Sequence, residues 1–279
     1  MTAPASPRDL ADLALAAARE AAALVRERAR GHVTVAAVKS SDIDVVTEAD
    51  RASEALIRAH LLAARPDDAF LGEESLGEEG DDVVGTSDVR WVVDPIDGTV
   101  NFLYGIPQYA VSVAAERGGE VVAGVVVDVQ AGTEYAGHVA DDDRPASATR
   151  DGEPIQVRGP APLAERLVAT GFSYDRRVRV LQAEAVTRLL PHVRDVRRLG
   201  SCALDLCLVA DGRMDAYVEE GVNYWDHAAA GLIARIAGAR TLVTEGVGGL
   251  ALLVCAPDHG FDDFLAAIRS AGFSPVSGE

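Results

Sequence analysis

Apolar and polar positions recur along the chain with two different periods, and these periods divide it into helical and strand-like segments. The segment that begins at Ser6-Pro7-Arg8-Asp9 predicts a helix to about Arg30, with Ser6 as its N-cap and Gly31 at its end. A second helical segment begins near Thr47, in VVTEADRASEALIRAHLLAA. The segments AFLGEES and DDVVGTSDVRWVVD predict strands, the first running into an acidic loop and the second ending as a buried strand.

Strands dominate the middle of the chain. The stretch YAVSVAAERGGEVVAGVVVDVQAGTEYAGHVA predicts a meander of strands with Gly-Gly at one turn. The polar stretch that follows, DDDRPASATRDGEPIQV, is rich in turn residues and predicts a boundary or a hairpin between two halves.

Strands and helices alternate in the remainder. The predicted strands are LVATGFS, MDAYVE and LALLVCAP, and the predicted helices are RVRVLQAEAVTRLLPHV, SCALDLCLVADG, WDHAAAGLIARIAGA and FDDFLAAIRSAG. Ser201 is a plausible cap for the short buried helix, which Gly212 ends, and Gly238 ends the one after it. The order predicts a mixed α and β protein in two halves, an α+β half over 1–145 and an α/β half over 146–279.

The chain is strongly acidic. Of its 279 residues 48% are apolar and 25% charged, which is ordinary for a globular protein, but the formal net charge is −18. Nucleic acids and anionic membranes are bound by basic patches, so we expect neither as a partner. The surplus of carboxylates also suits a chain that holds hard cations.

The cysteines predict a reducing environment. Cys202, Cys207 and Cys255 are odd in number and form no CxxC pair, which favours buried free thiols. The N-terminus has no basic-then-apolar signal pattern, and no apolar run reaches the length of a membrane span. We therefore expect a cytoplasmic location.

The segment Asp94-Pro95-Ile96-Asp97-Gly98-Thr99 has the composition of a binding turn. Pro95 restrains the backbone, Gly98 permits a close approach, and Thr99 is expected to cap the helix that TVNFLYG begins. A helix N-terminus attracts phosphate, but the two carboxylates would repel it. A divalent cation between them removes the conflict, and oxygen ligands suit Mg²⁺. The alternative is a simple strand-to-helix turn in which Asp97 is only a cap.

Three further acidic fragments are ambiguous when each is taken alone. Gly72-Glu73-Glu74-Ser75 can place a carboxylate at a strand end or form an acidic surface loop. Trp225-Asp226 begins an apolar helix, where the helix dipole favours an acid without any function. Thr47-Glu48-Ala49-Asp50 has the form of a capping box. For each of these the purely structural interpretation is favoured.

Taken together and in order, these fragments resemble the inositol monophosphatase family. The resemblance covers nearly the whole chain, in KSSDIDVVTEAD, LGEES, WVVDPIDGTVNFLYGIPQYAVSVA, GSCALDLCLVADGRMDAYVE and WDHAAAGLIARIAG. The DPIDGT and WD motifs together are highly specific for this metal-dependent phosphatase superfamily.

The resemblance implies a site with two or three Mg²⁺ ions. One ion would be bound by Glu73, Asp94 and the backbone carbonyl of Ile96, and a second by Asp94, Asp97 and Asp226. Most of these ligands belong to the half 1–145, and Asp226 belongs to the half 146–279. The six histidines form no ligand-like cluster, which fits an all-oxygen site better than a zinc site.

The resemblance also implies roles around the metal ions. Gly98 and Thr99 would present backbone N–H groups to the phosphate. Thr99 and Asp50 would help to activate a metal-bound water, with Glu73 as a further catalytic residue. Glu219 and Cys202 would contact the substrate, and Glu74 and Lys39 would support the site from behind. Lys39 is the only lysine in a chain that otherwise uses arginine, so it is either a retained site residue or one surviving surface lysine.

The implied activity is Mg²⁺-dependent hydrolysis of inositol monophosphate or a similar polyol phosphate by a metal-activated water. Val100 follows the DGT motif, where relatives that act on nucleotide 3′-phosphates or histidinol phosphate often have lysine. These two substrates and fructose 1,6-bisphosphate remain alternatives. An alternative of another class is a regulatory or binding protein on this scaffold, although the metal carboxylates and Thr99 are all retained.

The implied fold is a layered αβαβα sandwich with the site between the two halves. The resemblance further implies a homodimer and inhibition by lithium. No functional residue is assigned in the stretch after Thr244, which resembles the family least.

Overall fold

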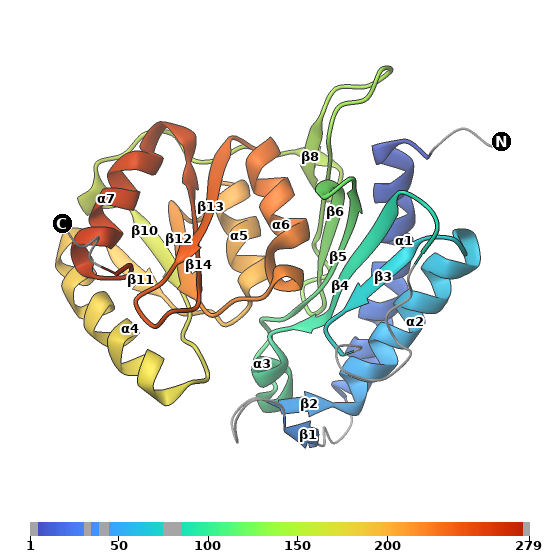
Figure 1. Cartoon of the computed structure of the whole chain (residues 1–279), viewed down its shortest axis with the longest axis horizontal. Helices are drawn as coiled ribbons and strands as arrows, with labels where there is room; N and C mark the ends of the chain where they lie inside the picture. The colour runs from blue at the N-terminus through green and yellow to red at the C-terminus, as the bar shows by residue number, and fades with distance from the viewer. Residues whose placement is uncertain (1–4, 31–34, 39–44, 75–84, 276–279) are drawn as a thin grey trace.

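Two β-sheets separated by a pair of helices give the molecule its layered architecture (Figure 1). The computed structural model describes residues 5–30, 35–38, 45–74 and 85–275. A pair of helices also covers the outer face of each sheet, so the layers run helix, sheet, helix, sheet, helix. This is the expected αβαβα sandwich.

The first sheet has seven strands in the order β3-β4-β5-β6-β7-β8-β9. Its strands are β3 (Ala69–Gly72), β4 (Val89–Asp97), β5 (Ala110–Arg117), β6 (Glu120–Asp128), β7 (Glu134–His138), β8 (Ser147–Arg150) and β9 (Glu153–Pro154). Only the β3–β4 pair is parallel. Helices α1 (Pro7–Arg28) and α2 (Glu48–Ala64) cover its outer face.

Both faces of this sheet are buried, which explains why its strands read as nearly continuous apolar runs. Successive residues of β4 show the alternation: Trp91 and Val93 pack with the α1–α2 layer, whereas Val92 packs with the inner helices. The core of the molecule therefore consists of separate apolar layers rather than one cluster.

The second sheet has five strands in the order β11-β10-β12-β14-β13. Its strands are β10 (Leu167–Thr170), β11 (Asp195–Arg197), β12 (Ala216–Glu220), β13 (Ala239–Glu245) and β14 (Ala251–Pro257). Helices α5 (Cys202–Ala210) and α6 (Tyr224–Ile236) lie between the sheets, and α4 (Arg176–Leu189) and α7 (Phe261–Ala271) cover the outside. Smaller elements are β1 (Val35–Val38), β2 (Val45–Thr47), α3 (Thr99–Tyr104), η1 (Leu163–Glu165), η2 (Leu190–His192) and η3 (Asp258–Gly260).

The helix caps follow the sequence closely. Ser6 caps α1 and Thr47 caps α2, each in a reciprocal capping box with the acid three residues later. Helix α1 ends at Arg28, slightly before the predicted Arg30, and Gly31 lies outside the described residues. Hydrogen bonds between residues three apart in the chain determine where these helices begin, so the sequence predicts their starting points.

Four strands were not predicted: β1 and β2, which form a separate two-stranded sheet, and β11 and β13, which lie at the edges of the second sheet. Strand β11 spans only Asp195–Arg197, and β13 alternates between exposed and partly buried residues, so neither shows a strong apolar pattern. The polar stretch at 141–157 does form the predicted hairpin, β8–β9. This hairpin extends the first sheet to Pro154, past the division expected at residue 145.

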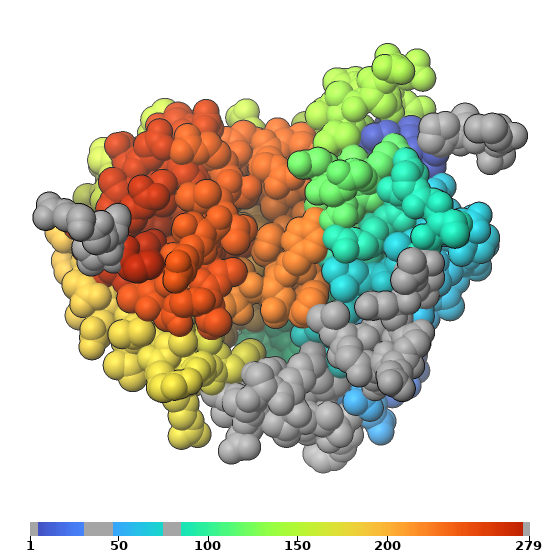
Figure 2. Space-filling model, in the orientation of Figure 1, coloured from blue at the N-terminus to red at the C-terminus, as the bar shows by residue number. Residues whose placement is uncertain are grey.

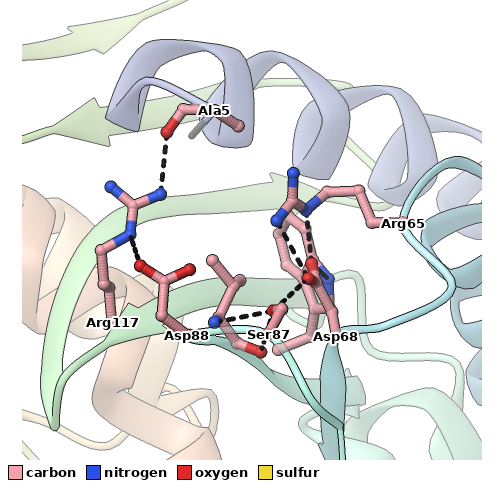
Figure 3. A network of polar contacts seen from close by, with 8 residues as sticks. Ala5, Arg65, Asp68, Ser87, Asp88 and Arg117 are labelled. Carbon is pink, nitrogen blue, oxygen red and sulfur yellow. Dashed lines mark hydrogen bonds and ion pairs between the residues drawn. The ribbon is translucent and has the colours of Figure 1, made fainter. Parts of the chain in front are cut away.

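The start of β3 is fixed to β4 by a buried carboxylate, Asp68 (Figure 3). Arg65 Nε donates to Asp68 Oδ2 at 2.5 Å, and Ser87 Oγ donates to Asp68 Oδ1 at 2.6 Å. Trp91 Nε1 donates to Asp68 Oδ2 at 2.9 Å. This buried charge is thus fully hydrogen-bonded, and it aligns the two strands that end at the candidate site.

Helix α6 packs unusually closely on the first sheet. A Cβ atom at Gly124 of β6 would lie 2.8 Å from Ala229 Cα, so only glycine fits beneath the helix. In the space-filling view the orange segment that includes α6 meets the green and cyan segments of the first sheet directly (Figure 2). This contact joins the two halves of the chain.

We predict that Gly124→Ala lowers the free energy of unfolding by about 2 kcal/mol, because the methyl group would overlap the backbone of α6. Urea unfolding measures this loss. Gly159→Ala is the matched control, because its Cβ would enter open space. Equal stability of the two variants would contradict the close packing of α6.

Candidate active site

The DPIDGT segment forms the end of β4 and the step into α3. The sequence suggests a tight turn after the strand, but β4 continues through Asp97 with an irregular register between Asp94 and Asp97. Ile96 N donates to Asp94 Oδ1 at 3.0 Å, so the side chain of Asp94 shapes the backbone that follows it. The N-cap of α3 is Gly98, with φ of 97°, and Thr99 is the first helical residue rather than the expected cap.

Gly98 is required by both conformation and space. Its φ is in the left-handed region, and a Cβ atom would lie 2.9 Å from Gln108 O and 3.1 Å from Gly200 O. The chain therefore passes close to the loop before α5 at this point. As a result, the acidic segment lies against the second half of the chain.

Asp97 makes this connection directly. Its carboxylate accepts hydrogen bonds from Ser201 Oγ at 2.5 Å, Ala203 N at 2.7 Å and Cys202 N at 3.2 Å. Burial raises the pKa of Asp97 to about 6, although these bonds at the α5 N-terminus favour its anion. The alternative interpretation of Asp97 as only a local cap therefore does not hold, because its carboxylate is bonded to a helix about a hundred residues away.

Asp50 and Thr99 are brought together as the resemblance implies. Thr99 Oγ1 lies 3.1 Å from Asp50 Oδ1 and 3.0 Å from Ile96 O. Thr47 donates to Asp50 Oδ2 through both its N–H, at 2.8 Å, and its hydroxyl. Burial raises the pKa of Asp50 to about 6 despite these bonds. The capping box of α2 therefore also holds the partner of Thr99.

Glu73 lies directly after β3, beside Asp94. Its N–H donates to Val93 O at 3.1 Å, which continues the parallel β3–β4 pairing by one residue. Burial raises the pKa of Asp94 well above its ordinary value, and the charges of Glu73, Asp97 and Asp226 raise it further. A hydrogen bond with the Glu73 side chain adds to this effect.

Asp226 reaches the same place from the first turn of α6. Its Oδ2 accepts a hydrogen bond from N of the N-cap residue Asn223 at 2.6 Å, as the third helical residue of a capping box does. Burial, followed by the charges of Glu73 and Asp97, also raises its pKa well above the ordinary value. The first turn is anchored to β5, because Tyr224 Oη donates to Glu116 Oε2 at 2.7 Å.

The site is thus a cluster of acids contributed by both halves of the chain, in which Asp94 and Asp97 are buried and Glu73 and Asp226 are partly exposed. The charges of three acids raise the pKa of Asp94 beyond the effect of its burial, and the charge of Arg198 lowers that of Asp97. All-oxygen donors of this kind fit a hard divalent cation. Within the described ranges no three acids, histidines or cysteines are already placed as a metal site. Asp94, Asp97 and Asp226 each accept a hydrogen bond from a backbone N–H group. These bonds partly offset the repulsion between the carboxylates.

The predicted substrate residues lie on the second-half side of the cluster. Tyr217 Oη donates to Glu219 Oε2 at 2.8 Å, and the Cys202 thiol is hydrogen-bonded to Tyr217. A Cβ atom at Gly171 would overlap the Glu219 carboxyl group, so the strand end at Gly171 leaves room for this acid. Burial raises the pKa of Glu219 to about 7.

Glu74 and Lys39 are the two residues predicted to support the site from behind, and the structure describes only the first of them. Glu74 lies beside Glu73, where its N–H donates to Glu54 Oε2 at 2.9 Å. Lys39 lies outside the described residues, so its predicted role stays a prediction.

Several residues at the site were not identified from sequence as functional. Ser201 was predicted only as a cap, and Tyr217, Ser53 and Glu54 were not singled out. Glu54 and Ser53 are buried polar residues inside an amphipathic helix, and that departure from the apolar pattern was the available signal.

A layered sandwich with an acid cluster between its halves is the arrangement that the sequence resemblance implies for a phosphatase. The model of the inositol monophosphatase family matches residues 6–266, and the chain belongs to that family. The curated inositol-1-monophosphatase SuhB of Mycobacterium tuberculosis is 44% identical over 288 residues, covering 97% of each chain.

A solved structure of Mycobacterium tuberculosis SuhB superposes with a TM-score of 0.81 at 43% identity, covering 97% of this chain and 99% of that one. A curated relative from Pasteurella multocida, named Nus factor SuhB, is 36% identical and covers 81% of this chain and 82% of its own. The predicted family, fold class and phosphatase activity are confirmed. No helix among the described residues is long and apolar enough to cross a membrane.

We predict that Ser201→Ala destabilises the metal-free protein more than Ser6→Ala does. Ser6→Ala removes only a helix cap, at a cost of about 1 kcal/mol. Ser201→Ala removes a cap and a hydrogen bond to the buried Asp97, so its cost should be about 2–3 kcal/mol. Urea unfolding in EDTA compares them, and equal losses would mean that the Asp97 bond does not stabilise the fold.

Proposed function

We propose that this phosphatase is a Mg²⁺-dependent phosphomonoesterase that hydrolyses inositol monophosphate or a similar polyol phosphate. The observation on which this rests is the cluster of Glu73, Asp94, Asp97 and Asp226, in which burial and the charges of neighbouring acids raise the pKa of Asp94 and of Asp226. Such a cluster is costly without a cation and well suited to hold one. The names of the relatives support the choice of an inositol phosphate.

The proposed metal ligands are the carboxylates of Glu73, Asp94, Asp97 and Asp226 and the carbonyl oxygen of Ile96. They fit two or three Mg²⁺ ions, because every donor is oxygen and most are anionic. When bound, the ions neutralise the phosphate and lower the pKa of a coordinated water.

The protein's own contribution to water activation is proposed to be the Thr47–Asp50–Thr99 chain. The Thr99 hydroxyl has one proton and two acceptors, Asp50 Oδ1 and Ile96 O, within reach, so it can bond to only one of them at a time. When it donates to Asp50, its lone pairs are free to orient the attacking water. Both bonds from Thr47 hold Asp50 in place for this role.

Phosphate and substrate contacts are assigned by the same reasoning. Gly98 and Thr99 are proposed to offer backbone N–H groups to the phosphate, at the start of α3 beside the acid cluster. Glu219, held by Tyr217, is proposed to bind a substrate hydroxyl, with Cys202 beside it. A carboxyl group with a pKa of about 7 can either donate or accept in such a contact.

We propose a homodimeric cytoplasmic enzyme that is inhibited by lithium. The three cysteines are free and buried, which suits a reducing compartment. The net charge of −18 argues against direct binding to nucleic acid. A regulatory role through a protein partner is a second candidate function, supported by the relative named Nus factor SuhB.

Phosphate release across a panel of substrates tests the proposed function. The panel contains inositol 1-phosphate, histidinol phosphate, fructose 1,6-bisphosphate and adenosine 3′,5′-bisphosphate, each with Mg²⁺ and with EDTA. We expect the highest kcat/KM for inositol 1-phosphate, and no phosphate release from any substrate in EDTA. If another compound of the panel gives a higher kcat/KM, that compound replaces inositol 1-phosphate as the proposed substrate. Phosphate release without Mg²⁺ would refute the proposed mechanism.

We predict that Asp94→Asn abolishes Mg²⁺-dependent phosphate release while the fold survives. The amide cannot replace the anionic ligand, but it removes a charge that three neighbouring acids repel, so the metal-free protein should not lose stability. Turnover and the melting temperature in EDTA are the two measurements. Asp142→Asn, at an exposed acid, is the control, and wild-type turnover by Asp94→Asn would refute the metal assignment.

We predict that Thr99→Ala lowers kcat by about 100-fold or more, because positioned proton transfer contributes that much to catalysis. Mg²⁺ affinity should change little, since the hydroxyl is not a proposed ligand. Steady-state kinetics and calorimetric Mg²⁺ titration separate the two quantities. Thr187→Ala, on the exposed side of α4, should change neither; an equal loss of metal affinity and turnover in Thr99→Ala would contradict the role of Thr99.

A further inference from the structure

Helix α2 has an unexpected row of polar side chains on its buried face. Asp50, Ser53 and Glu54 are at most 5% exposed, although an amphipathic helix normally buries apolar residues at such positions. Their spacing of three and four residues places them on one face of the helix. Farther along the same helix, Ile57 and Leu61 continue the buried face with ordinary apolar packing.

The three polar residues contact two segments of the candidate site: Asp50 and Ser53 contact the segment 94–99, and Glu54 contacts the segment after β3. Asp50 is bonded to Thr99, as described above. Ser53 Oγ donates to the carbonyl oxygen of Pro95 at 3.0 Å, between Asp94 and Ile96. Glu54 Oε2 accepts a hydrogen bond from Glu74 N at 2.9 Å. One helix face thus contacts both strand ends that supply proposed ligands.

Glu54 also packs against Gly72, the residue that precedes Glu73. A Cβ atom at Gly72 would lie 2.2 Å from Glu54 Oε2 and 2.4 Å from its carboxyl carbon, so β3 passes directly over this carboxylate. The Glu54 side chain therefore contacts the residues before and after Glu73, Gly72 through packing and Glu74 through a hydrogen bond. These two contacts hold the backbone in place on both sides of Glu73.

We propose that Glu54 is a positioning residue that holds Glu73 in the orientation needed to bind a metal ion. This inference rests on the proposed function, in which Glu73 is a ligand. Residues that orient a ligand from behind typically change metal affinity by about 10–100-fold when they are removed. Glu54 does not itself touch substrate, and its effect is transmitted through the backbone at Gly72 and Glu74.

The test is calorimetric titration of Mg²⁺ into the purified full chain, without substrate. Glu54→Ala should weaken Mg²⁺ binding by about 10-fold or more, and Glu54→Gln should restore most of that loss, because its amide oxygen can still accept from Glu74 N. Ile57→Val is the matched control, one turn farther along the same buried face. It should lower the melting temperature by about 3 °C and leave Mg²⁺ affinity unchanged.

Wild-type affinity in Glu54→Ala would overturn the proposal, as would equal weakening in Glu54→Ala and Glu54→Gln. If Glu54→Ala does not fold, Gly72→Ala decides the question, because it keeps Glu54 but displaces its carboxylate from beneath β3. Weakened Mg²⁺ binding in Gly72→Ala supports the proposal, and unchanged binding refutes it. Failure of the wild-type chain to bind Mg²⁺ at all would instead refute the proposed function.

Discussion

Mutual repulsion among closely placed carboxylates is the constraint on which the rest of this structure depends. Asp94, Asp97 and Asp226 are held near one another and near Glu73, and burial makes each charge more costly than it would be in water. The fold offsets part of this cost with donors aimed at single carboxylates, from Ile96 N, the α5 N-terminus and Asn223 N. The remaining negative charge is what would attract a cation.

The layered architecture explains how such a cluster is held rigid. Helix α6 contributes Asp226 and cannot shift easily, since it lies against Gly124 and is bonded through Tyr224 to Glu116 on β5. The N-terminus of α5 donates hydrogen bonds to Asp97, and helix α2 contacts the strand ends from the opposite side. The acids therefore sit where three helices and the ends of two strands meet, and a change in any of these packing contacts would alter the distances between the charges.

Much of the secondary structure was predictable because its causes are local. The boxes at Ser6 and Thr47, the Gly118-Gly119 turn and the apolar runs of β4 to β6 are all visible in short stretches of sequence. The edge strands β11 and β13 were missed because an edge strand buries little, so its apolar pattern is weak. The continuation of β4 through Pro95 was missed for a related reason: proline and glycine suggest a turn unless the pairing partner is known.

The sequence by itself determined the family, the fold class and the phosphatase activity, because motifs such as DPIDGT and WD are short strings of residues that can be read in order along the chain. It also identified the acids from which a metal site can be proposed. Only the tertiary structure decided their surroundings: Asp97 on the N-terminus of α5, Tyr217 against Glu219, and Glu54 beneath Gly72. These contacts join residues that are far apart in the chain or on different elements, and no local pattern encodes such a contact. Charge, hydrogen bonding and close packing act between them only after the layers have assembled.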